Sequence, residues 1–174
     1  MQRITSLSDY FKKYEQSEKD PEKFWSEIAD TFIWKKKWDK VLDWDFESVD
    51  IKWFKNAKLN ITENIFERNL KDRGDKTAII WEPNDPNEPS IHLTYNELYE
   101  ETCKFSNALR DKGVKKGDRV IIYMPMVPEA AIAMLACARV GAVHSVVFAG
   151  FSSISLADRI NDCQAKMILT SDGN

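Results

Sequence analysis

The sequence lacks the short motifs that mark the common catalytic and phosphate-binding sites. It has no glycine-rich GxxxxGK[ST] loop, no GxGxxG fingerprint and no GxSxG nucleophile motif. Its only histidines are His92 and His144, so a histidine cage for a metal ion is excluded. His144, inside an apolar strand, is interpreted as structural because no nucleophile is near it in the sequence. We therefore assign no catalytic residue and no metal site to these residues.

Cysteine and long hydrophobic runs are also scarce. Cys103, Cys137 and Cys163 are widely spaced and form no CxxC pair, which favours a reducing compartment over a disulfide framework. The first residues contain no apolar stretch of the kind found in a signal peptide. Prolines and charges interrupt residues 120–148 before the roughly 20 apolar residues that a membrane span needs. The sequence predicts a cytoplasmic protein without membrane contact.

Neither sign of charge is in excess. The chain has 25 basic and 28 acidic residues, a net charge of −3, and 43% hydrophobic residues over 174 positions. The densest basic run, residues 35–37, is followed closely by aspartates and is interpreted as a solvated surface. This balance gives no reason to expect nucleic acid as a partner, and the length suffices for one domain's core.

Residues 1–60 and 61–174 differ in composition and in sequence pattern. Five of the six tryptophans lie in the first 60 residues, among many charges. Pro21 opens a predicted helix that carries Phe24, Ile28 and Phe32 on one face. The residues that follow this helix, to about Asn60, show no clean periodicity and are expected to wrap over another surface and bury their tryptophan rings there.

Residues 61–174 alternate regularly between strand and helix patterns. Strands are predicted at 77–81, 91–93, 119–124, 143–148 and 166–170, with helices between most of them. Helix starts are indicated by Thr62, by a Thr94–Glu97 capping box and by Pro128, and Gly141 fits just past a helix end. This alternation predicts an α/β fold with a predominantly parallel sheet, right-handed crossovers and covering helices.

One turn in this part attracts a functional interpretation. Phe148-Ala149-Gly150 follows a strand that we expect to be buried and precedes a helix that Ser152 or Ser153 can cap. Ligands of open parallel sheets collect beyond the carboxyl ends of the strands, where a glycine permits close approach and helix N–H groups favour anions. On the local pattern alone, an ordinary strand-to-helix turn is the favoured interpretation.

The order and spacing of several blocks resemble a known family from about Asp20 to Asp172. The blocks are Trp53-Phe54, Leu59-Asn60, Asp75-Lys-Thr-Ala-Ile-Ile-Trp-Glu82, Leu93-Thr-Tyr-Asn-Glu-Leu98, Lys116-Gly-Asp118, Tyr123 to Phe151, and Leu156-Ala-Asp-Arg-Ile160. Leu93 to Leu98 is similar to the acyl-adenylate-forming superfamily as a whole. The block that includes Met124 to Ala131 and Val143-His-Ser145 narrows the resemblance to the N-terminal part of AMP-forming acetyl-CoA synthetases.

The resemblance implies an enzyme that makes acetyl-CoA from acetate, ATP and coenzyme A through an acetyl-adenylate, with Mg²⁺ as cofactor. It implies an N-terminal segment at 1–60 and the start of the AMP-binding domain at 61–174. It also places Phe148, Ala149 and Gly150 against the nucleotide end of coenzyme A. The family usually has glycine where this chain has Ala149, and the extra methyl group narrows the approach to that backbone.

We expect the chain to be the N-terminal piece of a longer polypeptide, inactive by itself. The phosphate loop, the basic residues for the coenzyme A phosphates and a carboxyl-terminal lysine, which the reaction needs, are absent from it. The partners implied are the small-molecule substrates and the remainder of the same polypeptide. Two alternatives stay open, namely a propionyl-CoA or other short-chain acyl-CoA synthetase and a stand-alone non-catalytic binding module.

Overall fold

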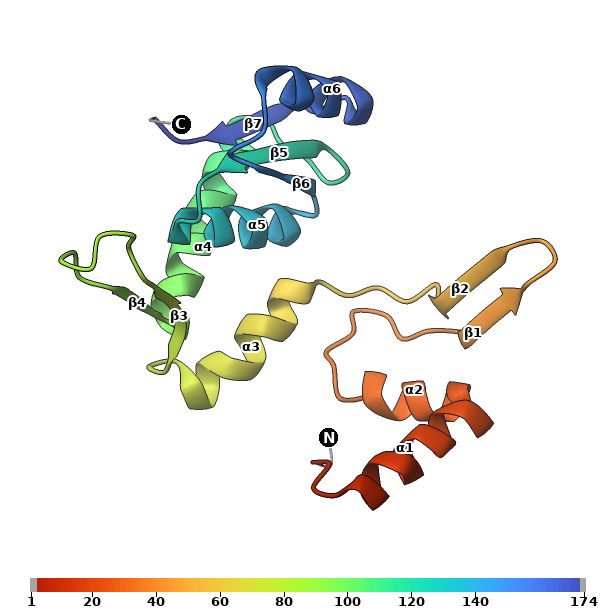
Figure 1. Cartoon of the computed structure of the whole chain (residues 1–174). Helices are drawn as coiled ribbons and strands as arrows, with labels where there is room; N and C mark the ends of the chain where they lie inside the picture. The colour runs from red at the N-terminus through yellow and green to blue at the C-terminus, as the bar shows by residue number, and fades with distance from the viewer. Residues whose placement is uncertain (1–2, 173–174) are drawn as a thin grey trace. The chain divides into compact units, whose positions relative to one another are not determined.

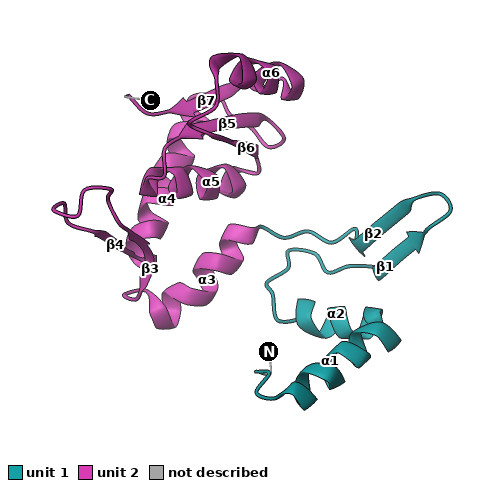
Figure 2. Cartoon of the chain, viewed as in Figure 1, with its two compact units in different colours: residues 1–60 teal, residues 61–174 magenta. Residues whose placement is uncertain are grey.

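The protein forms two compact units in a computed structural model that describes residues 3–172. The first unit is Met1–Asn60 and the second is Ile61–Asn174 (Figure 2). Each unit has its own elements and its own packed side chains, and the two are described in turn.

The first unit contains two helices and a β-hairpin. Helix α1 spans Leu7–Lys19, helix α2 spans Pro21–Ala29, and the antiparallel strands β1 and β2 span Lys40–Asp45 and Asp50–Lys55 (Figure 1). The predicted helix start at Pro21 is confirmed, with Asp20 as its N-cap. Helix α1 and the hairpin were not predicted. Helix α1 buries none of its residues, so its apolar side chains give no core-facing stripe.

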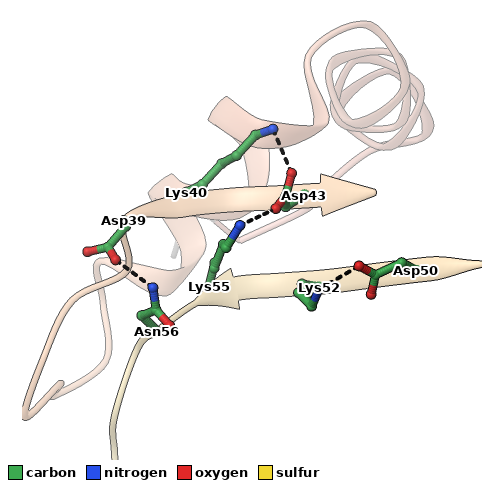
Figure 3. A network of polar contacts seen from close by, with 7 residues as sticks. All are labelled: Asp39, Lys40, Asp43, Asp50, Lys52, Lys55 and Asn56. Carbon is green, nitrogen blue, oxygen red and sulfur yellow. Dashed lines mark hydrogen bonds and ion pairs between the residues drawn. The ribbon is translucent and has the colours of Figure 1, made fainter. Parts of the chain in front are cut away.

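The hairpin places an apolar face and a charged network on the same two strands. Leu42 lies opposite Trp53 and Trp44 opposite Ile51. Between them, Asp43 accepts hydrogen bonds from Lys40, at 3.0 Å, and from Lys55, and these cations lower the pKa of the Asp43 carboxyl to about 2 (Figure 3). The ion pairs are well exposed, so they add little to stability and mainly keep this face polar.

The tryptophans pack against one another within this unit. Trp34, Trp38 and Phe54 form a three-ring cluster with centroids 5.1–5.6 Å apart, and Trp53 joins it through Phe54 at 6.0 Å. The indole N–H of Trp34 donates to the carbonyl of Ala29 at 2.7 Å, which ties the cluster to helix α2. The rings thus pack against one another, but their expected burial is wrong: none of the five tryptophans is buried, and Trp25, Trp44 and Trp53 are 41–59% exposed.

The second unit carries the predicted alternation of strands and helices. Its elements are α3 (Ile61–Arg73), β3 (Thr77–Trp81), β4 (Ile91–Thr94), α4 (Tyr95–Asp111), β5 (Arg119–Met124), α5 (Pro128–Val140), β6 (Val143–Phe148), α6 (Ser153–Cys163) and β7 (Met167–Thr170). Strands β3 and β4 form an antiparallel pair. Strands β6, β5 and β7 lie in that order in a parallel sheet, with α4 and α5 on one side and α6 on the other (Figure 1).

Strand β5 is the centre of this sheet and of the core. Val120, Ile121 and Ile122 have no exposed surface. On one side Val120 packs with Leu109 of α4 and with Ala136 and Cys137 of α5. Burial raises the pKa of the Cys137 thiol to about 11, so this side chain stays a neutral part of the core. A second cluster joins Phe66, Leu98 and Ile132 from the three helices α3, α4 and α5.

Two sequence-based expectations need correction in this unit. The strand 143–148 was expected to be buried, but among its side chains only Val147 is, because β6 lies at one edge of the described sheet. Thr62 was expected to cap helix α3, but the helix already begins at Ile61 and Thr62 is fully buried inside its first turn. The Thr94–Glu97 capping box and the left-handed Gly141 after α5, with φ 78°, are confirmed.

We predict that Glu97→Ala lowers the stability of the chain at neutral pH but much less in acid. The backbone N–H and hydroxyl of Thr94 donate to the Glu97 carboxylate and hold its pKa below the usual value. A carboxylate with a depressed folded-state pKa stabilises above its unfolded pKa, near 4.5, and the contribution is lost as the pH falls through the folded value.

Urea unfolding of both proteins at pH 7 and near pH 3 measures this difference. Glu88→Ala, in the exposed loop between β3 and β4, is the matched control and should leave the unfolding midpoint nearly unchanged at both pH values. An equal gap between Glu97→Ala and the unmutated chain at both pH values would contradict the prediction.

We predict that Val49→Gly stabilises the chain by about 1 kcal/mol, because a β-branched residue here adopts the left-handed conformation that glycine tolerates. Val49 ends the hairpin loop with φ 55° and is 80% exposed, so little packing is lost. Ser48→Gly, at the preceding loop position without positive φ, is the control and should destabilise slightly. Urea midpoints compare the three proteins, and a lower midpoint for Val49→Gly would refute the strain argument.

Candidate functional site

The candidate site lies at the carboxyl end of strand β6, where the chain turns into helix α6. Residues 148–151 form a β-turn in which the Phe151 N–H donates to the Phe148 carbonyl at 3.0 Å. Ser152 then caps helix α6, accepting a hydrogen bond from the Ser155 N–H at 3.3 Å. The predicted site residues Phe148, Ala149 and Gly150 therefore occupy one tight turn at the sheet edge where ligands of parallel sheets bind.

Ala149 and Gly150, the two small residues of the turn, differ in the space that they leave for a side chain. A Cβ atom on Gly150 would lie 2.5 Å from Cε1 of Phe148, so glycine is needed for the Phe148 ring to lie where it does. Ala149 is not among the described non-glycine residues with positive φ, so its backbone accepts a side chain without strain. Of the two positions, therefore, only 150 requires a residue without a side chain.

The side chains around the turn present rings and a cation. The Phe148 ring is 67% exposed and meets the Phe151 ring edge-on at 5.8 Å. The Arg159 guanidinium lies 4.8 Å from the centre of the Phe151 ring and donates to the Ser155 carbonyl at 3.0 Å. Arg159, on helix α6, is therefore fixed beside the turn and brings positive charge to it.

A tyrosine that the sequence analysis did not single out holds the turn from below. The hydroxyl of Tyr123, near the end of β5, shares its single proton between the carbonyl oxygens of Ala149, at 2.7 Å, and Phe151, at 3.0 Å. On the neighbouring loop, the Trp81 indole N–H donates to the Met126 carbonyl at 2.6 Å. The two loops that follow β5 and β6 are thus each anchored by a side chain from another segment.

The groups at this site are suited to binding a ligand. Backbone N–H groups, exposed rings and a guanidinium can hold an anionic or aromatic ligand. Among the described residues, no group of three or more histidine, cysteine, aspartate or glutamate side chains could hold a metal ion. The described helices include none that is both long and apolar enough to cross a membrane.

Comparison with protein families assigns both parts of the chain. Residues 66–174 match the family described as AMP-binding enzyme, and residues 10–65 match acetyl-coenzyme A synthetase N-terminus.

Individual relatives agree with this assignment. The chain is 56% identical over 164 residues to an acetyl-coenzyme A synthetase of Syntrophobacter fumaroxidans and 52% identical over 168 residues to one of Halorhodospira halophila. These alignments cover 94% and 96% of the chain but 25% and 26% of the relatives, so the chain spans about a quarter of their length.

A solved structure with a similar fold is acetoacetyl-CoA synthetase from Streptomyces lividans. It matches with a TM-score of 0.79 and 27% identity, over 90% of this chain and 24% of that protein.

Proposed function

This chain belongs to the family of AMP-binding enzymes, and on that premise we propose that it is the N-terminal quarter of an AMP-forming acetate–CoA ligase. The observation that carries the proposal is the succession of an acetyl-coenzyme A synthetase N-terminus at residues 10–65 and the AMP-binding family from residue 66. Identities above 50% to acetyl-coenzyme A synthetases, against 27% to an acetoacetyl-CoA synthetase, favour acetate over a bulkier acid.

The proposed reaction has two steps. A carboxylate oxygen of acetate attacks the α-phosphorus of ATP, forming acetyl-adenylate and releasing pyrophosphate. The thiol of coenzyme A, which gives up its proton, then attacks the acetyl carbon, and AMP leaves as acetyl-CoA forms. The described residues do not fit a Mg²⁺ site, so we assign the metal and the phosphate-binding groups for ATP to the rest of the enzyme.

Within this scheme we propose different roles for different parts of the chain. Residues 1–60 act as the N-terminal segment, and residues 61–174 form the beginning of the AMP-binding domain. Phe148, Ala149 and Gly150 border the nucleotide end of coenzyme A. The exposed Phe148 ring and the cation of Arg159 beside the turn support that assignment, since coenzyme A carries both an aromatic base and phosphates. Free, well-buried Cys137 supports a cytoplasmic location.

We predict that the complete enzyme catalyses acetate-dependent exchange of pyrophosphate into ATP and forms acetyl-CoA, whereas the 174 residues alone do neither. In this proposal the groups that stabilise charge on the α-phosphate and the leaving pyrophosphate belong to the rest of the enzyme. Exchange assays with acetate and propionate, followed by acetyl-CoA detection, measure both claims. Acetate-dependent AMP release by the pure fragment would overturn the second claim, and a strong preference for propionate would overturn the choice of acid.

We predict that Gly150→Ala in the complete enzyme raises the KM for coenzyme A about fivefold, as expected for the loss of one good contact. The new Cβ displaces the exposed Phe148 ring, while the acetate- and ATP-dependent exchange reaction stays unchanged. Gly117→Ala is the control, because φ 86° makes it strained while nothing lies within 4 Å of the added Cβ. It should lower stability without changing the KM for coenzyme A, and the same KM rise in both variants would refute a local contact.

A further inference from the structure

We propose that Tyr123 is a positioning residue for the coenzyme A-dependent step, because its hydroxyl fixes the direction of the backbone N–H groups of Gly150 and Ser152. The proposal deepens the function given above and rests on it. It concerns a side chain on a different strand from the turn itself.

The strand pairing places Tyr123 next to the end of β6, from which the turn begins. Tyr123 pairs with Val147 in the parallel ladder between β5 and β6, so the two side chains lie on the same face of the sheet. From there the ring extends toward the carboxyl edge, and its hydroxyl meets two carbonyls, those of Ala149 and Phe151. These carbonyls flank Gly150, the residue with the most backbone freedom in the turn.

The hydrogen bond that these two carbonyls share with Tyr123 sets the direction of the backbone N–H groups of Gly150 and Ser152. A peptide unit is planar and trans, so its C=O and the following N–H point in opposite directions. With the Ala149 carbonyl held toward Tyr123, the Gly150 N–H is directed away from it. The Phe151 carbonyl constrains the Ser152 N–H in the same way. One hydroxyl thus orients two backbone donors at the start of helix α6, where an anionic ligand is favoured.

Without the hydroxyl, the turn keeps its own hydrogen bond from Phe151 to Phe148 but loses both carbonyl anchors. The 149–150 and 151–152 peptide units could then rotate, and a ligand would have to order them on binding. Preorganised donors avoid this cost, so the loss of the hydroxyl weakens binding of the ligand. The core is little affected, because Tyr123 is only half-buried and phenylalanine retains the ring.

The test is Tyr123→Phe in the complete enzyme, with Tyr99→Phe as the matched control. Tyr99 is likewise half-buried, and its hydroxyl accepts a hydrogen bond from Arg139 at 3.4 Å on the helices α4 and α5, away from the turn. For each protein, the KM for coenzyme A is measured in acetyl-CoA formation, and the acetyl-adenylate step is measured separately by acetate-dependent pyrophosphate exchange. Isothermal titration of coenzyme A provides an independent dissociation constant.

Tyr123→Phe should raise the KM and the dissociation constant for coenzyme A about fivefold, while pyrophosphate exchange and the values for Tyr99→Phe stay near those of the unmutated enzyme. Unchanged coenzyme A binding in an otherwise active Tyr123→Phe enzyme overturns the proposal alone. Equal losses in both half-reactions overturn it in favour of a general structural role. Absence of acetate-dependent exchange in the unmutated enzyme overturns the proposed function as well.

Discussion

The structure of the second unit depends on the burial of the three central residues of strand β5. Val120, Ile121 and Ile122 are three consecutive side chains without exposure, which requires packed layers on both faces of the sheet. Both parallel neighbours, β6 and β7, form their hydrogen bonds to this strand. The same strand carries Tyr123 one residue further on, so the element that holds the core together also supports the turn at the sheet edge.

The parts of the fold that were predictable are those marked by residues close together in sequence. The Thr94–Glu97 capping box is complete within four residues, and the start of α5 at Pro128 and the left-handed Gly141 after it each follow from one residue's backbone preference. Strands 119–124 and 143–148 were bounded correctly because turn residues interrupt apolar runs. Their parallel direction also followed, since a single helix between two strands favours a parallel crossover.

The parts that were missed depend on contacts between distant segments. Tyr123 reaches carbonyls 26 and 28 residues further along the chain, and no local pattern shows that a hydroxyl will meet them. The prediction that β6 is buried was wrong for the same reason. Whether β6 is a central or an edge strand depends on the order of strands in the sheet and not on its own apolar content. In the first unit, Phe54 directly follows Trp53 and so interrupts the apolar–polar alternation that would have indicated strand β2. Its backbone adopts φ 48°, and its ring lies in the tryptophan cluster, 5.1 Å from Trp38.

The geometry of the turn explains why alanine is accommodated at position 149. The need for glycine has two separable origins, a positive φ and a lack of space for Cβ. Neither a positive φ at 149 nor one at 150 is present, but the Phe148 ring leaves no space at 150. Because the Ala149 carbonyl is held by Tyr123, the direction of the peptide is set by that hydrogen bond and not by the absence of a side chain. The methyl group of Ala149 therefore leaves the direction of the Gly150 N–H unchanged.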